Sequence, residues 1–514
     1  MTWRLFLILI FLLLLPGCSG VHGPVIIPSP EGFQATRNNP APPTRPSLET
    51  PLPPLKNSKT PFPANPPATV PAIPPPLPGQ TVNPSQPPSN LHRAENPQIG
   101  LNFITFFWNE ARNNELNTTT PHYQPQVIFN DFHELGVQVY RQFIKGDLLW
   151  NVVEPQDNRW NFTAADAVIK NAEFEPIVTL FALQYASPTP PWEKNSSRFQ
   201  KTLGPEAKDY LITVVQRYAA YVRYWELGNE MDHWRAADPG STGARPDQIP
   251  AMRPQDGFSP REQGIFLAQA AALIRQYDSD AVIVMPGMSG LDEYVTHTWL
   301  AGVIAGGGKD WFDIINYHYY SQWDRYVQPR KQLNQYLIEQ GLSGKPVWLT
   351  ETGSTTLAAL RQRTNYPNSS ETQAADIFRR IVPAYGHGDA LAIWHTYISS
   401  PEDGTDNTWA LYGIRTDKGI AQPSYYAFKL LSKELIPFQK VEVISDDPKE
   451  SNVYKIILKN GAVKYVAWGR GTFTVPAGMS QVTSVIPRLD GTFTWEPVQP
   501  GKPLILTEKP VVIK

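Results

Sequence analysis

The chain has 514 residues, with 45 Lys and Arg against 47 Asp and Glu and a formal net charge of −2. This balance lacks the clustered positive charge that binding to phosphates requires, so we expect no nucleic-acid partner. A single Cys excludes an intramolecular disulfide and a cysteine-rich metal centre, and no motif implies a metal or another cofactor.

The first 18 residues are typical of an export signal. Arg4 precedes an apolar run, residues 5–15, that is too short to span a bilayer as a mature helix. The run leads into Leu15-Pro16-Gly17-Cys18, which resembles the bacterial lipobox, and the only Cys stands where lipidation needs it. We therefore expect lipidation of Cys18 and an exported lipoprotein anchored in the membrane on its extracytoplasmic side. An ordinary cleaved signal with a chance Cys is the alternative.

Residues 19–97 form a proline-rich segment, with three consecutive prolines at 74–76. Proline fixes φ and lacks the amide donor, so neither a helix nor a central strand is expected here. A disordered stalk is predicted, and in the polyproline II conformation it would rise about 3.1 Å per residue. Such a stalk would hold the following domain away from the membrane. A proline-rich ligand for a partner domain is the alternative for this segment.

Residues 98–435 have the composition of a globular domain in which short apolar runs alternate with helical patterns. Apolar residues recur at three- and four-residue spacing in the helical stretches. The expected strands are 99–107, 137–143, 176–181, 222–227, 281–285, 313–317, 347–349 and 390–394, and the expected helices are 164–172, 206–220, 261–277, 325–340 and 374–385. Eight strands in alternation with helices predict an α/β fold, a closed (β/α)₈ TIM barrel. An open doubly wound sheet is disfavoured, because Trp108-Asn109-Glu110 after the first strand lacks a glycine-rich turn.

Residues 436–514 show a period of two instead. Short alternating segments are separated by turn residues, and Asn460-Gly461 and Asp490-Gly491 are typical of β-hairpins. Strands are expected at 440–444, 454–458, 462–468, 471–475, 481–486, 492–495 and 504–507. The sequence therefore predicts a small C-terminal β-sandwich domain.

Polar residues stand where the barrel strands end. In a (β/α)₈ barrel the carboxyl ends of all strands meet at one mouth, where site residues are found. The residues in question are Arg141, Glu226, Asn229, Glu230, His318, Tyr320 and Glu351, with Trp394 at the end of the eighth strand. Glu230 and Glu351 follow the fourth and seventh strands, so two carboxylates are expected to face each other across the mouth.

Such a pair suits the cleavage of a glycosidic bond. One carboxylic acid protonates the leaving oxygen while a carboxylate captures the oxocarbenium-like centre. A separation of about 5–5.5 Å leaves no room for water between them, so the reaction proceeds through a covalent intermediate with retention.

The segments 224–230 and 347–353 resemble the acid/base and nucleophile strands of retaining glycoside hydrolases of clan A, with family 39 the most similar. The resemblance covers roughly residues 98–435. It implies Glu230 as the acid/base and Glu351 as the nucleophile. It also implies Asn229 as a donor to the sugar 2-hydroxyl, Arg141 and Tyr320 as partners of the nucleophile, and His318 as part of the sugar site.

Several of these residues have competing interpretations. Glu226 is expected in a lower layer of the barrel, paired with a polar neighbour. His318 is alternatively a core histidine, and Tyr319 competes with Tyr320 for the nucleophile. Trp394 is expected as a flat floor beneath a sugar ring, with barrel packing as the alternative.

The loops add an expectation about the substrate. Residues 231–259 form a long loop after the acid/base glutamate that suits one wall or a lid of a cleft. Trp192, Trp323 and Trp409 suit platforms for neighbouring sugars. We expect a carbohydrate partner, a β-linked oligo- or polysaccharide, cleaved by double displacement. A transglycosylase using the same site and a non-catalytic polysaccharide-binding protein of the cell surface are the alternatives.

Overall fold

The computed structural model describes residues 91–103, 125–142, 148–180, 203–233, 259–356, 370–399 and 411–514, apart from 149, 294, 308 and 417, and the pairs 108–109 and 115–116. All of them belong to the second of the two units, 1–64 and 65–514, into which the chain divides. The predicted signal, Cys18 and nearly all of the predicted stalk lie outside the described residues.

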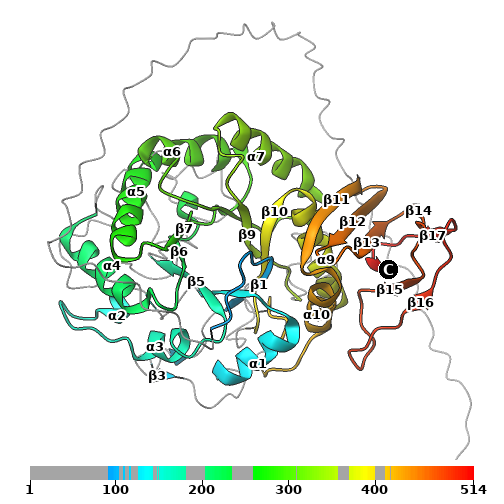
Figure 1. The fold of residues 1–514 in the computed structure, drawn as a ribbon, viewed down its shortest axis with the longest axis horizontal. Helices are drawn as coiled ribbons and strands as arrows, with labels where there is room; N and C mark the ends of the chain where they lie inside the picture. The colour runs from blue at the N-terminus through cyan, green and yellow to red at the C-terminus, as the bar shows by residue number, and fades with distance from the viewer. Residues whose placement is uncertain are drawn as a thin grey trace, which may run out of the picture. The chain divides into compact units, whose positions relative to one another are not determined.

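A parallel sheet that closes on itself forms the centre of the described structure (Figure 1). Its strand order is β7-β6-β5-β4-β1-β10-β9-β8. Parallel bridges from Val284 to Ile314 and from Met288 to Tyr317 join the two ends. The strands are β1 (Ile99–Phe103), β4 (Val139–Gln142), β5 (Glu175–Leu180), β6 (Tyr224–Leu227), β7 (Val282–Val284), β8 (Ile315–Tyr319), β9 (Val347–Thr352) and β10 (Asp389–Trp394). The predicted (β/α)₈ barrel is confirmed.

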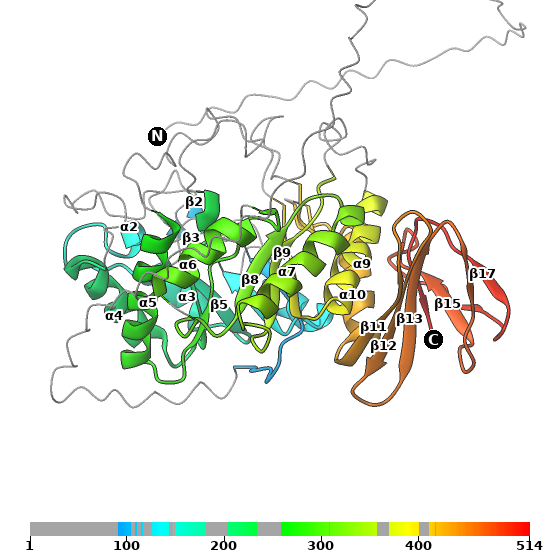
Figure 2. The same cartoon turned by 90° about the horizontal axis from the view of Figure 1, so that it is seen from above.

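Helices follow the strands and surround the barrel (Figures 1 and 2). They are α1 (Pro125–Leu135), α2 (Trp150–Val153), α3 (Thr163–Ile169), α4 (Pro205–Tyr218), α5 (Pro260–Tyr277), α6 (Leu300–Gly307), α7 (Val327–Glu339), α9 (Ser370–Gly386) and α10 (Pro423–Leu435). The start of helix α5 is determined by local sequence, because Ser259 and Glu262 form a capping box and Pro260 occupies the first turn. Two short strands, β2 (Trp108–Asn109) and β3 (Glu115–Leu116), follow β1 in the sequence and pair with each other in antiparallel fashion.

Alternate strand residues point into the barrel. One apolar cluster contains residues from strands all around the barrel, and such residues can meet only in its interior. The cluster consists of Val139, Ile177, Tyr224, Val284, Ile314, Trp348, Leu391 and Ile393. The next residue along each strand points outward. Tyr140, Val178 and Trp225, for example, belong to the larger core between strands and helices. This alternation fixes the direction of each side chain further along its strand.

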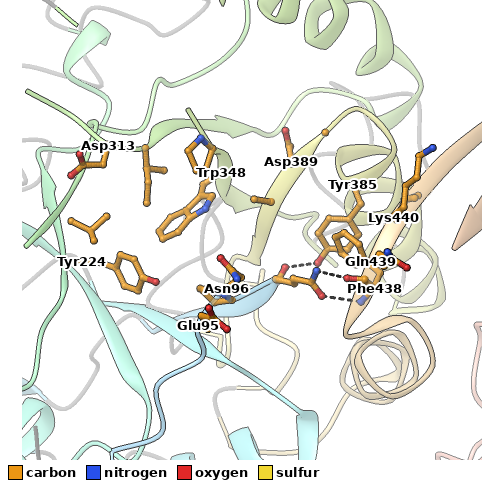
Figure 3. A pocket seen from close by; sticks show the side chains of 18 of the residues that line it. Glu95, Asn96, Tyr224, Asp313, Trp348, Tyr385, Asp389, Phe438, Gln439 and Lys440 are labelled. Atoms are coloured by element: carbon orange, nitrogen blue, oxygen red, sulfur yellow. Dashed lines mark hydrogen bonds between the residues drawn. The ribbon is translucent and has the colours of Figure 1, made fainter. Parts of the chain in front are cut away.

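A cavity of about 630 Å³ lies at the amino-terminal end of the barrel strands (Figure 3). Tyr224 and Trp348 line it, with their ring centroids 5.0 Å apart in an edge-on arrangement. Asn96, Asp389 and Lys440 contribute polar groups to the lining. Because Tyr224 and Trp348 stand near the starts of β6 and β9, this cavity is at the opposite end from the predicted site.

The C-terminal domain contains a six-stranded sheet, ordered β11-β12-β13-β18-β15-β16, and the pair β14-β17. The strands are β11 (Phe438–Asp446), β12 (Ser451–Leu458), β13 (Val463–Gly469), β14 (Thr472–Thr474), β15 (Gln481–Ser484), β16 (Glu496–Pro497), β17 (Pro503–Ile505) and β18 (Val511–Ile513). Asn460-Gly461 connects β12 and β13, which pair in antiparallel fashion, as predicted. The strand expected at 492–495 does not form, and β15 pairs with β16 instead.

The expectation that Trp323 is a platform for a neighbouring sugar is wrong. Its side chain is buried, its ring and that of Trp468 form a T-shaped pair with centroids 6.1 Å apart, and the Arg379 guanidinium lies 5.1 Å from its ring centroid. Trp323 therefore joins the barrel to the C-terminal domain and is not a sugar platform. Within the described part of the chain, no helix is long and apolar enough to cross a bilayer.

Candidate active site

A layer of buried polar side chains lies next to the apolar cluster inside the barrel, on the side of the carboxyl ends of the strands. These residues are Asn102, Arg141, Thr179, Glu226, Asn316 and Thr350, and each follows an inward-facing position of its strand by two residues. Charged groups are rarely buried unless they are paired and hydrogen-bonded. The layer must therefore satisfy its own hydrogen bonds.

Arg141 and Glu226 form the centre of this layer. Nε and Nη2 of Arg141 donate to the two carboxylate oxygens of Glu226 at 2.6 and 2.9 Å. The Glu226 carboxylate also accepts from Thr179 Oγ1 at 2.5 Å and from Asn316 Nδ2 at 2.7 Å. Glu226 is thus a lower-layer residue paired with polar neighbours, in agreement with the sequence interpretation.

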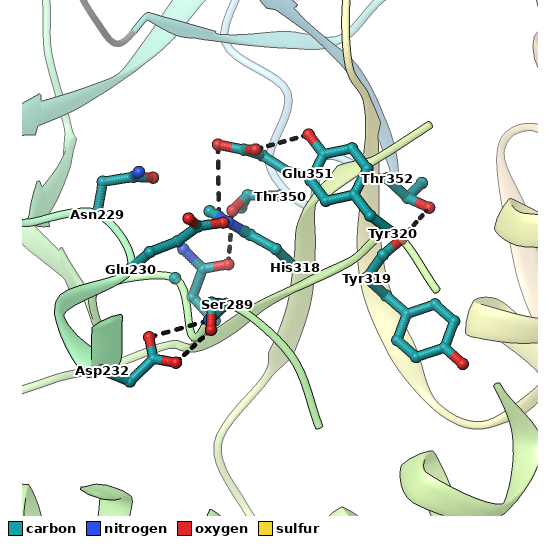
Figure 4. A network of polar contacts seen from close by, with 12 residues as sticks. Asn229, Glu230, Asp232, Ser289, His318, Tyr319, Tyr320, Thr350, Glu351 and Thr352 are labelled. Carbon is teal, nitrogen blue, oxygen red and sulfur yellow. Dashed lines mark hydrogen bonds and ion pairs between the residues drawn. The ribbon is translucent and has the colours of Figure 1, made fainter. Parts of the chain in front are cut away.

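The structure brings Glu230 and Glu351 together. One carboxylate oxygen of each and one ring nitrogen of His318 all lie within 4.8 Å of one another (Figure 4). Nδ1 of His318 is 2.7 Å from Oε1 of Glu230, and its Nε2 is 3.6 Å from Oε1 of Glu351. Glu351 lies near the end of β9 and Glu230 follows β6, so the geometry derives from the parallel arrangement of the barrel.

Two donors hold the Glu351 carboxylate. Nη1 of Arg141 donates to its Oε1 at 2.6 Å, and the hydroxyl of Tyr320 donates to its Oε2 at 2.7 Å. Burial raises the pKa of Tyr320 well above its usual value, and the charge of Glu351 raises it further. The neighbouring Tyr319 points away and donates to the carbonyl of Gln322 (Figure 4). Tyr320, and not Tyr319, therefore contacts this carboxylate.

Arg141 is positively charged although it is fully buried. Burial by itself would lower the pKa of Arg141, but the carboxylates of Glu226 and Glu351 raise it above its ordinary value. One guanidinium therefore serves two buried acids. Its Nη2 also donates to Oδ1 of Asn229 at 2.7 Å, which orients the amide of Asn229 beside the carboxylate pair.

The backbone around Glu230 has an unusual conformation. Glu230 has a φ of 45°, in the left-handed region that residues other than glycine seldom adopt. Its amide donates to the carbonyl of Gly287 at 2.9 Å, and Gly228 before it has a φ of 117°. Non-glycine residues in this region cluster at functional sites, where the surrounding structure holds them.

His318 is fully buried beside the pair. Burial lowers the pKa of His318 to about 4, against the raising effect of Glu351. The imidazole is therefore neutral above this pH. A neutral imidazole offers one donor and one acceptor nitrogen, so contact with Glu230 can orient its carboxyl group in either protonation state.

The expectation that Trp394 forms a floor beneath a sugar ring is wrong. Its indole is fully buried and belongs to the core between strands and helices, whereas Leu391 and Ile393 on the same strand point into the barrel. Strand alternation turns His395, the next residue, toward the mouth. The sequence analysis did not name His395, and the parity of positions along this strand is the signal that would have found it.

Glu230, His318 and Glu351 are also a set that could in principle ligate a metal ion. The geometry argues against a cation between them, because the Arg141 guanidinium already donates to the Glu351 oxygen that is closest to His318. A second positive charge at that oxygen would be repelled. The three side chains therefore form a pair of carboxylates beside a buried imidazole and do not suit a metal site.

Parts of the predicted site lie outside the described residues. They include the loop segment 234–258, Trp192 and Trp409. Within the predicted lid, Met231–His233 forms a single 3₁₀ turn, and Asp232 is anchored by Ser289, whose amide donates to it at 3.0 Å.

The chain matches no family model and no curated protein sequence. Among solved structures, it is similar to a family 39 glycoside hydrolase from the gut symbiont Bacteroides cellulosilyticus WH2, with a TM-score of 0.56 and 17% identity over 81% of this chain and 80% of that one. A monomeric β-xylosidase from Caulobacter crescentus CB15 gives 0.52 and 16% over 82% and 97%. The catalytic domain of GH30 xylanase C from Talaromyces cellulolyticus gives 0.52 and 14% over 83% and 98%. At these identities the likeness shows a shared fold.

Proposed function

We propose that this protein is a retaining O-glycoside hydrolase, with Glu351 as nucleophile and Glu230 as acid/base. The observation that carries the proposal is the carboxylate pair, whose closest oxygens lie within 4.8 Å at the carboxyl-terminal mouth of the barrel. This separation suits direct attack on a sugar, because it leaves no room for a water molecule between the Glu351 carboxylate and the anomeric carbon.

In the first step Glu351 attacks the anomeric carbon while Glu230 gives its proton to the departing oxygen. The C–O bond to the leaving group breaks as the glycosyl–Glu351 ester forms. Arg141 and Tyr320 align the Glu351 carboxylate through hydrogen bonds of 2.6 and 2.7 Å. His318 orients the Glu230 carboxyl from 2.7 Å.

In the second step Glu230 removes a proton from water, and the hydroxide oxygen attacks the anomeric carbon. The ester bond breaks, Glu351 is restored, and the configuration is retained after two inversions. If a sugar hydroxyl replaces water, the same residues carry out transglycosylation. A non-catalytic binding protein has no need for an arginine shared between two buried acids, so the site supports catalysis.

The substrate class we propose is a β-linked oligo- or polysaccharide. Two of the similar structures are named as a β-xylosidase and a xylanase, which makes aryl β-xylosides and xylan the first substrates to test. A wider set of aryl glycosides and wall polysaccharides would cover other sugars.

The test removes each carboxylate in turn. Glu351→Ala should abolish turnover of aryl β-glycosides. Glu230→Ala should still form the glycosyl-enzyme from substrates with good leaving groups, and azide should rescue its turnover to a glycosyl azide of retained configuration.

Glu339→Ala, at the exposed end of α7, is the control that removes a carboxylate far from the mouth and should leave turnover unchanged. Wild-type behaviour of the Glu230→Ala variant would refute the acid/base role. No turnover by the wild-type protein on any glycoside would refute the proposed function itself.

We also propose that the exported protein is anchored by a lipid on Cys18. The support is the sequence alone, since the lipobox-like Leu15-Pro16-Gly17-Cys18 contains the only Cys. Cys18→Ser in the full chain should release the protein from the membrane fraction. Unchanged membrane association of this variant would rule out lipidation as the anchor.

A further inference from the structure

Strand β10 directs a histidine, and not a tryptophan, to the mouth of the barrel. Leu391 and Ile393 lie in the apolar cluster inside the barrel, while Ala392 and Trp394 lie in the core outside it. His395 continues the inward-facing series, and its amide donates to the carbonyl of Thr352 at 2.8 Å. The position is thereby fixed at the level of Glu351, next to the end of β9.

The imidazole of His395 forms a wall with two tyrosines. Its ring centroid lies 5.8 Å from that of Tyr320 at 90°, and 5.9 Å from that of Tyr412 at 67°. The two tyrosine rings are 5.7 Å apart and nearly perpendicular. Because the Tyr320 hydroxyl donates to Glu351, this wall borders the nucleophile directly.

The burial of His395 is compatible with contact to a sugar. Its residue exposure is 3%, and that of Glu351, which the mechanism requires to touch the anomeric carbon, is 4%. Arg141 and Glu230 are the charged groups that act on it. Burial lowers the pKa of His395 to about 3, and Arg141 lowers it further, so the ring is neutral at ordinary pH.

We propose that His395 binds the sugar held between Glu230 and Glu351, through a hydrogen bond to one of its hydroxyls. The inference rests on the proposed glycosidase function. A neutral imidazole carries one donor and one acceptor, and a sugar hydroxyl can use either. An indole at this position would instead offer a broad apolar face. The site is therefore selective for a hydroxyl and not only for a flat ring face.

The barrel also indicates which hydroxyl is not involved. In the closed strand order, β10 is four strands from β6 in both directions, so His395 and Asn229 approach from opposite walls. The family resemblance implies that Asn229 donates to the 2-hydroxyl. His395 should consequently recognise a hydroxyl on the other side of the ring.

A double-mutant cycle between protein and substrate tests this contact. The aryl β-glycoside that the wild type hydrolyses best is compared with its monodeoxy analogues, using wild type and His395→Phe. We expect His395→Phe to lower kcat/KM about 10- to 100-fold on the parent glycoside. One analogue, other than the 2-deoxy one, should be poor for wild type and no worse for the variant.

Trp394→Phe is the matched control, because its side chain lies outside the barrel. It should lower the midpoint of thermal unfolding and leave the discrimination between parent and deoxy substrates unchanged. His395→Gln, which keeps a donor and an acceptor, should recover part of the loss and covers the case in which His395→Phe does not fold.

Two results would overturn the inference. If His395→Phe loses the same factor on every analogue, or loses nothing, His395 does not bind a hydroxyl. These results refute the inference alone when the wild type shows turnover that Glu351→Ala abolishes. Absence of wild-type turnover would refute the proposed function and the inference with it.

Discussion

Nδ1 of His318 lies 2.7 Å from Oε1 of Glu230. His318 is on β8 and Glu230 follows β6, and these two strands become near neighbours only because the barrel closes. Gly287 lies between them, after β7. A Cβ atom on Gly287 would lie 2.1 Å from Nε2 of His318. The absence of a side chain at Gly287 thus provides the space for the imidazole.

Gly287→Ala should therefore displace the imidazole and break its contact with Glu230. Turnover should fall at least about tenfold, because Glu230, the proposed acid/base, loses its orientation. Steady-state kinetics on an aryl glycoside measures this. Gly290→Ala is the control, because a Cβ there meets nothing within 4 Å. Equal activity of both variants would contradict the prediction.

Tyr320→Phe should reduce kcat roughly 10- to 100-fold by removing its hydrogen bond to Glu351. Tyr319→Phe loses a hydroxyl of the same kind from the adjacent residue, whose bond goes to a backbone carbonyl. It should retain kcat. A similar loss in the two variants would show that the effect comes from packing.

Arg141→Lys should destabilise the protein and reduce turnover at least about 100-fold. A single ammonium cannot satisfy Glu226, Glu351 and Asn229 together, and an unpaired buried carboxylate costs about 3–5 kcal/mol. Denaturant unfolding and kinetics measure the two effects.

Arg330→Lys provides the comparison for Arg141. Arg330 is equally buried and pairs with Asp389, which starts β10 at the amino-terminal end of the barrel. This variant should lose stability and keep kcat. If both variants lost kcat to the same extent, the special role of Arg141 would be refuted.

Acid should destabilise the fold between about pH 6.5 and pH 4. Burial lowers the pKa of His318 and of His387 to about 4, and that of His395 to about 3. In this range the unfolded chain binds protons at these positions and the folded protein does not, so the free energy of unfolding falls as pH falls. The shift of His318 alone corresponds to about 3 kcal/mol.

Urea unfolding at a series of pH values measures this dependence. His387→Gln, which lies away from the carboxylate pair, should flatten the decline by removing one of the three buried imidazoles. A free energy of unfolding that stays constant from pH 7 to pH 4 in the wild type would contradict the prediction.

Most barrel strands could be predicted because each is a short apolar run buried on both faces. Helices were predicted less completely, and α1, α2, α6 and α10 were missed. In α6, glycine lowers the intrinsic helix propensity, and packing provides the reason for it: a Cβ on Gly306 would lie 1.9 Å from the carbonyl oxygen of Arg261. That close approach to α5 is a tertiary property.

The sequence by itself determined that polar residues follow the strands, and with parallel strands Glu230 and Glu351 had to lie at one mouth. It did not determine which residue of Trp394 and His395 faces that mouth, because residues 390–394 are apolar on both faces and show no alternation. Only the tertiary structure decided this, through the register of β10 against β1 and β9. The closed strand order likewise lets Arg141 on β4 serve both Glu226 on β6 and Glu351 on β9, a pairing that no local pattern contains.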